Sequence, residues 1–281
     1  MELWYALVEL LPFEWAAPGT FFMKNALLAV LVVCPLYGLL STMVVTNRMS
    51  FFSDALGHSA FTGIAIGTLC GLADPMWAAI VLAAAFALLF TYVQRKSNMA
   101  SDTVIGVFSS TAVALGIFIA TFDSGSFTKF NSLLIGDILS VEPGKIALLA
   151  VILLVVVLLW LCSFNGLMLS SVHPALADSR EVQVFWQEVV FSMAIAVVVT
   201  VSMTWVGLLV INSLLVLPAA AARNLARNMR QFHLFSIVAA IVAGVAGLLT
   251  SYELGSSAGA SITLYLALWF AITFLLRKTR L

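Results

Sequence analysis

The sequence is constrained most by the length of its uncharged, apolar runs. From Val189 to Ala222 no residue carries a charge. A helix rises about 1.5 Å per residue and the hydrocarbon core of a bilayer is about 30 Å thick, so this run is too long for one crossing. We expect the chain to turn at Trp205-Val206-Gly207, because glycine adopts backbone conformations that other residues avoid. The run therefore predicts two transmembrane helices.

Similar apolar stretches recur along the whole chain. Of its 281 residues, 63% are hydrophobic and 9% are charged, whereas soluble domains average about 45–50% and about 25%. A soluble fold could not bury this surplus, so it must face lipid. A crossing needs about 20 apolar residues. The stretches that meet this rule are residues 21–45, 51–71, 75–94, 102–122, 145–165, 184–204, 207–223, 231–250 and 257–276. The predicted fold class is all-α, a polytopic transmembrane helical bundle of about eight or nine spans.

Basic residues follow every second predicted span. They are Arg48, Arg95, Lys96, Arg180, Arg223, Arg227, Arg230, Arg277, Lys278 and Arg280. All lie on one side of the membrane if the N-terminus starts outside, and the positive-inside rule makes that side cytoplasmic. We therefore expect a multi-pass protein of the cytoplasmic (inner) membrane, with its N-terminus out and its C-terminus in.

Two regions are distinguished along the chain. Residues 1–20 contain Trp4, Tyr5 and Trp15, whose side chains favour the headgroup zone, and they predict an interfacial N-terminal segment. Residues 21–281 form a single transmembrane domain without a long linker or a low-complexity tract.

Motifs typical of several other protein classes are missing from the sequence. Lys and Arg number 13 and Asp and Glu number 13, a balance that gives no reason to expect a nucleic-acid partner. There is no GxxxxGK[ST] phosphate loop, so ATP hydrolysis is expected only on a separate chain. HExxH and GxSxG are missing as well. We expect no enzymatic activity and no permanently bound cofactor.

Asp54 and His58 most need an explanation, because charged groups inside a bilayer cost about 2.5–3.5 kcal/mol each. They are four residues apart, so a helix places them on one face about a turn apart. A carboxylate and an imidazole both bind first-row metals, and together they suit zinc or manganese. Small residues around them, among them Gly57 and Gly63, would let another helix approach closely. The alternative interpretation is structural: Asp54 caps its helix, and His58 bonds to Asp54 or to a carbonyl.

A metal site needs more than these two ligands. Most oligomers are symmetric, so a homodimer would bring two copies of Asp54 and His58 near its axis. Two carboxylates and two imidazoles would complete a four-coordinate site.

Other ionisable residues are weaker candidates. Asp137 and Glu253 lie near the predicted outer face, where we expect them to guide cations as an outer gate. Ser101-Asp102 is expected to cap the helix that follows it. Glu188, about a turn into its span, is expected to reach the interface or an arginine.

The residues around Asp54 resemble a known family signature. The stretch Asn47 to Ser59 reads NRMSFFSDALGHS, which resembles the RMS-x-x-x-D-x-x-x-H signature of zinc/manganese-type ABC permeases, the ABC-3 family. Further matches follow in the order typical of the family. They are Thr103-Val104-Ile105-Gly106, Ala114-Leu115-Gly116, residues 134–139, Val206-Gly207-Leu208-Leu209, residues 217–223 and residues 257–262. The resemblance covers residues from about 25 to 275.

This resemblance implies a function and a set of partners. It implies a homodimeric permease in the lipid bilayer, two copies of a separate ATP-binding cassette ATPase, and an extracytoplasmic metal-binding protein that delivers the ion. It also implies that Asp54 and His58 line the path of the metal, which alternating access driven by the ATPase would move across the membrane.

The resemblance further implies a cytoplasmic coupling helix near residues 170–183, within the transmembrane permease domain. The residues expected to contact the ATPase are Pro174, Ala177, Asp178, Ser179 and Arg180. Proline suits the first position of such a helix. Relatives usually carry a glycine near Ser179 or Arg180, and this chain does not.

The transported metal is predicted from a difference in the motif around Asp54 and His58. The motif reads Asp-Ala-Leu-Gly-His-Ser rather than the Asp-Ala-Ile-Ser-His-Ala common in manganese importers, which favours Zn²⁺, with Mn²⁺ and Fe²⁺ as alternatives. Two other functions stay open. One is an ATP-independent secondary transporter in which Asp54 and His58 relay protons or ions. The other is a membrane scaffold subunit without a transport path.

Overall fold

The computed structural model describes residues 2–10, 12, 14–97, 99–122, 135–172 and 184–278. Within these ranges all regular structure is helical. The long helices are α2 (Phe21–Thr46), α3 (Phe52–Leu69), α4 (Met76–Lys96), α5 (Ser101–Ala120), α7 (Pro143–Val172), α9 (Val184–Val206), α10 (Leu208–Leu225), α11 (Met229–Leu254) and α12 (Ala258–Lys278). Shorter elements are α1 (Glu2–Val8) and the 3₁₀ turns η1 (Glu14–Ala16) and η2 (Ile138–Ser140).

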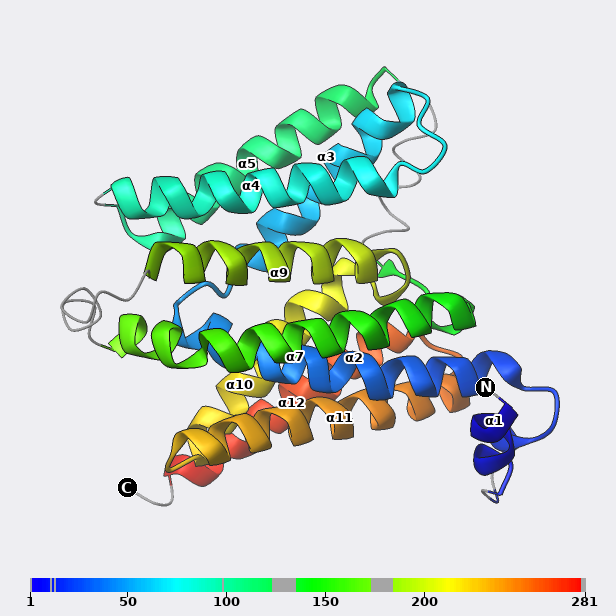
Figure 1. The fold of residues 1–281 in the computed structure, drawn as a ribbon. Helices are drawn as coiled ribbons and strands as arrows, with labels where there is room; N and C mark the ends of the chain where they lie inside the picture. The colour runs from blue at the N-terminus through cyan, green and yellow to red at the C-terminus, as the bar shows by residue number, and fades with distance from the viewer. Residues whose placement is uncertain are drawn as a thin grey trace.

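The long helices run side by side in one bundle, and the two termini lie at opposite ends of it (Figure 1). Helix α2 packs against α10, α11 and α7, and α12 covers α10 and α11. Helices α4 and α5 both pack against α3 and also contact each other. Helix α9 contacts α4, α7 and α3 and so joins the two groups.

Each of the nine predicted spans coincides with one of these helices. In the described part of the chain, eight helices are long and apolar enough to cross a membrane, which confirms a multi-pass membrane protein. The ninth, α3, has 18 residues and is not among the eight. It is the helix that carries Asp54 and His58, so its polar content lowers its hydropathy.

The predicted turn after Val206 is confirmed. Helix α9 ends at Val206 and α10 begins at Leu208. Between them, Gly207 has a φ of 85°, a left-handed conformation that favours glycine.

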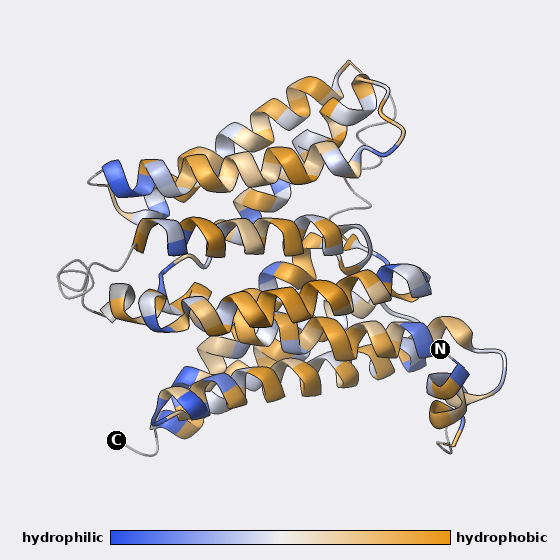
Figure 2. Cartoon of the chain, in the orientation of Figure 1, coloured by the Kyte–Doolittle hydropathy of each residue, from blue (hydrophilic) through white to orange (hydrophobic). Residues whose placement is uncertain are grey.

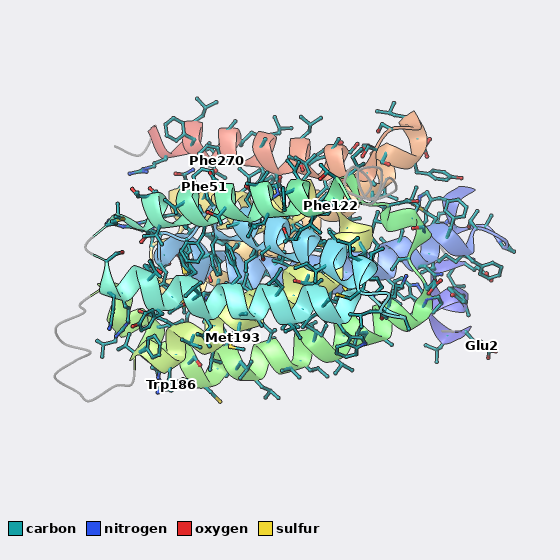
Figure 3. All side chains as sticks on the ribbon, turned by 90° about the horizontal axis from the view of Figure 1, so that it is seen from above. Glu2, Phe51, Phe122, Trp186, Met193 and Phe270 are labelled. Atoms are coloured by element: carbon teal, nitrogen blue, oxygen red, sulfur yellow. The ribbon has the colours of Figure 1, made fainter. Side chains whose placement is uncertain are left out.

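Burial divides the helices into central and peripheral ones. Most residues of α2 and α9 are buried, whereas α4, α5, α7 and α12 expose large apolar side chains. Apolar residues cover the length of the bundle and polar residues gather at its ends (Figure 2). Trp186 of α9 and Phe270 of α12 lie on opposite edges of the bundle (Figure 3). This pattern is typical of a helical bundle surrounded by lipid.

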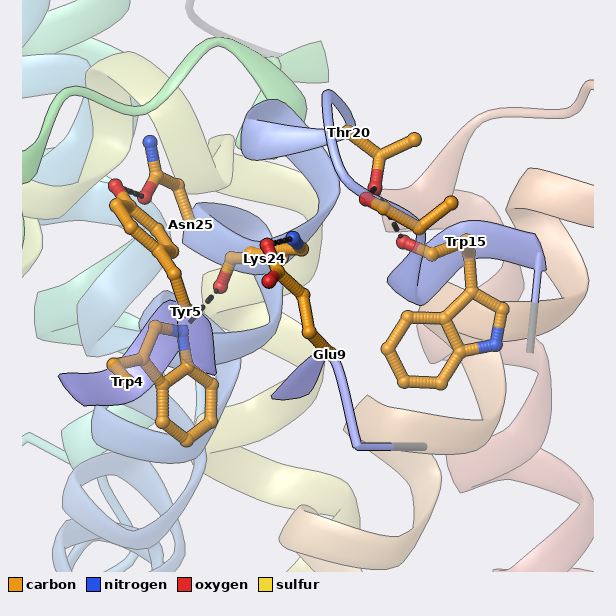
Figure 4. A network of polar contacts seen from close by, with 8 residues as sticks. Trp4, Tyr5, Glu9, Trp15, Thr20, Lys24 and Asn25 are labelled. Atoms are coloured by element: carbon orange, nitrogen blue, oxygen red, sulfur yellow. Dashed lines mark hydrogen bonds and ion pairs between the residues drawn. The ribbon is translucent and has the colours of Figure 1, made fainter. Parts of the chain in front are cut away.

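The N-terminal segment folds back onto the start of α2 (Figure 4). Trp4 donates from Nε1 to the carbonyl of Lys24 at 3.0 Å, and the Tyr5 hydroxyl donates to Oδ1 of Asn25 at 2.8 Å. The fully buried ammonium of Lys24 lies 2.6 Å from Oε1 of Glu9. A buried charge needs such a partner. These contacts anchor α1 to the bundle, while its predicted interfacial position stays a prediction.

One predicted cap is wrong. Ala100, not Ser101, is the N-cap of α5, and no side chain there bonds to the backbone of the first turn. The physical reason is that the Ser101 hydroxyl accepts a hydrogen bond from Nε2 of Gln94 at 2.7 Å. The hydroxyl thereby ties α5 to α4.

Candidate functional site

Asp54 and His58 lie one turn apart on the same face of α3, as their spacing predicts. Nε2 of His58 is 3.4 Å from Oδ2 of Asp54. The side chain of Asp54 is 42% exposed in the single chain and that of His58 is 16% exposed. The structure therefore brings an imidazole and a carboxylate together at a partly open face of the helix.

The structural alternative is only half correct. Phe51, not Asp54, is the N-cap of α3, and Asp54 makes no capping hydrogen bond. Its two carboxylate oxygens instead face His58 and a residue of another helix. The contact between His58 and Asp54 exists, and it is compatible with both the structural and the metal-binding interpretations.

Asn212 is the third polar residue at this site. Its Nδ2 donates to Oδ1 of Asp54 at 3.0 Å and links α10 to α3. Its own Oδ1 is buried and has no hydrogen-bond partner among the described residues. Leaving such a group unpaired costs about 1–3 kcal/mol, so a purely structural role explains it poorly. Sequence reasoning missed Asn212, although an amide inside an uncharged apolar span is a recognised signal of helix association or function.

Close packing holds α10 against α3 at this site. A Cβ on Gly57 would overlap the side chain of Leu208, the first residue of α10. A Cβ on Gly63 would overlap the backbone of Ala79 on α4. The prediction that small residues around Asp54 and His58 let another helix approach closely is thus confirmed: Gly57 admits α10, and Gly63 admits α4 on another face of α3.

A separate cavity of about 210 Å³ lies beside η2. Asp137 lines it together with Ser256, Ser257 and Gly259. Oδ1 of Asp137 accepts a hydrogen bond from the backbone of Leu139 at 3.1 Å and caps η2. One carboxylate and two hydroxyls make this cavity polar on one side.

The structure does not bring the two predicted outer-gate residues together in that cavity. Glu253 is exposed near the end of α11 and is not among the residues that line it. The gate function of Asp137 and Glu253 stays a prediction. The predicted coupling residues lie outside the described part of the chain. They are Pro174, Ala177, Asp178, Ser179 and Arg180.

Glu188 behaves as predicted. Its Oε2 lies 2.9 Å from Nε of Arg95, which joins α9 to α4. Both side chains line a cavity of about 150 Å³ with Thr91 and Ser192.

The part of a single chain that the structure describes does not bring together a full set of metal ligands. Among the described residues, no group of three or more His, Cys, Asp or Glu side chains is placed to hold one ion. Asp54 and His58 alone offer two possible ligands, and an ion between them would need further ligands from water or another molecule.

Comparisons with known proteins agree with one another. The model of the ABC 3 transport family matches residues 20–277. The manganese import system permease protein ScaB of Streptococcus gordonii is 29% identical over 253 residues, 90% of this chain and 90% of ScaB. The high-affinity zinc uptake system membrane protein ZnuB of Haemophilus influenzae is 25% identical over 253 residues, 90% of this chain and 97% of ZnuB.

A solved structure has the same fold. The structure of PsaBC from Streptococcus pneumoniae in complex with Fab contains a chain that matches with a TM-score of 0.78 and 28% sequence identity. The match covers 98% of this chain and 95% of that one, so the whole described bundle has a counterpart there.

Proposed function

Because the chain belongs to the ABC 3 transport family, we propose that it is the permease subunit of an ATP-driven importer of a divalent transition metal ion, with zinc as the cargo. The relatives named above import manganese or take up zinc. The observation in this chain that carries the proposal is the pair of Asp54 and His58 on α3.

The separation of the pair is compatible with a shared ion. Charge-assisted N–H···O bonds measure about 2.7–2.9 Å, whereas Oδ2 of Asp54 and Nε2 of His58 are 3.4 Å apart. Two ligands of one tetrahedral ion, each about 2.0–2.2 Å from it, are about 3.3–3.6 Å apart. A zinc ion would therefore fit between these atoms with little movement of either side chain.

The remaining ligands come from a second copy of the chain in this proposal. Asp54 is partly exposed in the single chain, so the face of α3 that carries it is open to a partner. A symmetric dimer would place a second carboxylate and a second imidazole opposite the first pair. Together the two pairs would supply four ligands, the number that zinc prefers.

The placement of basic residues supports an orientation with the N-terminus outside. Arg95 and Lys96 end α4, and Arg277 lies in the last turn of α12. These helix ends lie at the same end of the bundle as the C-terminus, where hydrophilic residues gather (Figures 1 and 2). The positive-inside rule makes that end cytoplasmic. A separate ATPase would bind there, and an extracytoplasmic metal-binding protein would bind at the other end.

Metal accumulation in a host that lacks its own importers tests the proposal. The host expresses the chain with an ATPase and a metal-binding protein of the same transport system, and cellular zinc is measured by mass spectrometry. Wild type should restore zinc, while Asp54→Asn and His58→Ala at equal membrane expression should not. Accumulation that persists without the ATPase would indicate a secondary transporter. Accumulation that is equal in wild type and both variants would overturn the proposed site.

A further inference from the structure

We propose that Asn212 is a positioning residue that makes the ion site select zinc over manganese. Asn212 donates a hydrogen bond to Oδ1 of Asp54, which leaves Oδ2 as the carboxylate oxygen that can bind the ion. This inference rests on the proposed function and names a determinant of its cargo. It concerns a residue on α10, a helix that contributes no ionisable group to the site.

The geometry assigns different neighbours to the two oxygens of Asp54. Oδ1 accepts the hydrogen bond from Nδ2 of Asn212 at 3.0 Å, across 158 residues of sequence. Oδ2 lies 3.4 Å from Nε2 of His58. The carboxylate is thus turned so that a single oxygen faces the imidazole, and an ion between them would meet a monodentate ligand.

Asn212 is held in this position by the packing of its own helix. Leu208 and Asn212 are four residues apart on α10 and share one of its faces. Leu208 fits against Gly57, where there is no room for a Cβ. This packing fixes the backbone of α10 beside α3 and so keeps Asn212 within reach of Asp54.

The amide also has a defined direction. An amide presents a donor nitrogen and an acceptor oxygen, and only the nitrogen can bond to an ionised carboxylate. Nδ2 consequently faces Asp54, while Oδ1 of Asn212 is left buried without a partner among the described residues. An asparagine needed only for packing could be replaced by leucine without that cost.

Coordination through a single carboxylate oxygen favours the binding of zinc over the binding of manganese. Zinc is satisfied by four ligands in a tetrahedron, to which each carboxylate contributes one oxygen. Manganese favours six ligands and oxygen-rich sites, which a carboxylate serves better when both of its oxygens are free. A manganese ion at this site would have to compete with Asn212 for Oδ1, so the hydrogen bond disfavours manganese more than zinc.

The test compares zinc and manganese accumulation in the importer-deficient host, each supplied separately as its chloride. Asn212→Leu removes the amide donor and keeps a side chain of similar volume. Asn212→Asp removes the same donor and keeps the shape of the side chain. Asn212→Gln keeps a donor. Asn224→Leu is the matched control, because Asn224 also lies on α10 and its Nδ2 donates to Thr273, 3.3 Å away, rather than to Asp54.

We expect Asn212→Leu to reduce zinc accumulation about tenfold, the usual effect of losing a hydrogen bond to a metal ligand. Manganese accumulation should fall less or rise, so that the ratio of zinc to manganese drops. Asn212→Asp should lower the ratio as well, Asn212→Gln should restore part of it, and Asn224→Leu should leave it unchanged.

The outcomes separate this inference from the proposed function. If wild type accumulates zinc and Asp54→Asn does not, the function stands. An unchanged zinc-to-manganese ratio in Asn212→Leu or Asn212→Asp then overturns the inference alone. If Asn212→Leu does not reach the membrane, Asn212→Asp and Asn212→Gln decide the question by the same ratio. If Asp54→Asn accumulates zinc as wild type does, the function and the inference fail together.

Discussion

Gly136 and Gly207 pack backbone to backbone. A Cβ on either glycine would overlap the backbone of the other segment, and both residues have positive φ values, 65° and 85°. The turn between α9 and α10 is thereby fixed against the segment that leads into η2. Helix α10 starts at this contact and carries Asn212 one turn further along. Helix α10 therefore reaches both the cavity beside η2, which Val210 lines, and the Asp54 site, where Asn212 bonds to Asp54.

Gly207→Ala should destabilise the protein strongly. At a φ of 85° and a ψ of 142° the backbone lies in a region that is almost restricted to glycine and costs another residue about 1–3 kcal/mol, and the Cβ would also overlap the carbonyl of Ile135. Thermal unfolding of the purified protein measures the effect. Gly71→Ala is the matched control, because Gly71 has a φ of 67° and open space around it, so it should show only the conformational cost. Equal melting temperatures for the two variants would contradict the contact.

Gly57→Ala should reduce metal accumulation in the importer-deficient host while lowering the melting temperature of the purified protein only slightly. The added Cβ would meet the flexible end of Leu208, which can shift, but the shift separates α10 from α3 next to Asp54. Truncating the side chain that it meets should relieve the effect, so Gly57→Ala with Leu208→Ala should accumulate more metal than Gly57→Ala alone. Additive losses in the double variant would indicate that the two residues act independently.

Removing the charge of Glu9 should destabilise the protein more than removing the charge of Lys24. Lys24 is fully buried and Glu9 is 37% exposed. Glu9→Gln would leave a buried ammonium without its partner and should cost about 3–5 kcal/mol, whereas Lys24→Met leaves a carboxylate that water can reach. Melting temperatures of the two variants are the measurement. A larger loss for Lys24→Met than for Glu9→Gln would be inconsistent with this assignment.

The ion pair of Arg95 and Glu188 should contribute much less to the stability of the protein than the pair of Glu9 and Lys24 does. Its side chains are 39% and 31% exposed, and partly hydrated ion pairs contribute about 0–1 kcal/mol. Glu188→Gln should therefore lower the melting temperature by less than Glu9→Gln does, measured in the same detergent. A loss as large as that of Glu9→Gln would mean that α4 and α9 depend on this ion pair.

The transmembrane helices could be predicted because each depends on local composition. A run of about 20 apolar residues has few alternatives to a membrane-spanning helix. The turn at Gly207 could be predicted for the same reason, since the uncharged run from Val189 to Ala222 that contains it is too long for one crossing. The cap at Ser101 was wrong because its hydroxyl bonds to Gln94 on another helix, which local spacing does not reveal.

The site was only partly predictable. Asp54 and His58 are neighbours on one helix, so their spacing is sufficient to place them together. Asn212 comes from a helix 158 residues away, and a neutral amide does not stand out as a charge does. The lining of the η2 cavity by Asp137 and Ser257 also depends on tertiary packing. The shared position of Asp137 and Glu253 near the predicted outer face could not separate the two, and of them only Asp137 lines this cavity.

The stoichiometry of zinc bound to the purified permease tests the central claim most directly. The full chain is placed in lipid nanodiscs and titrated with zinc chloride, and bound zinc is counted per chain by mass spectrometry. A site shared by two copies of Asp54 and His58 predicts one zinc ion per two chains, lost in Asp54→Asn and in His58→Ala. Binding of one zinc per chain, or binding that both variants retain, would contradict it.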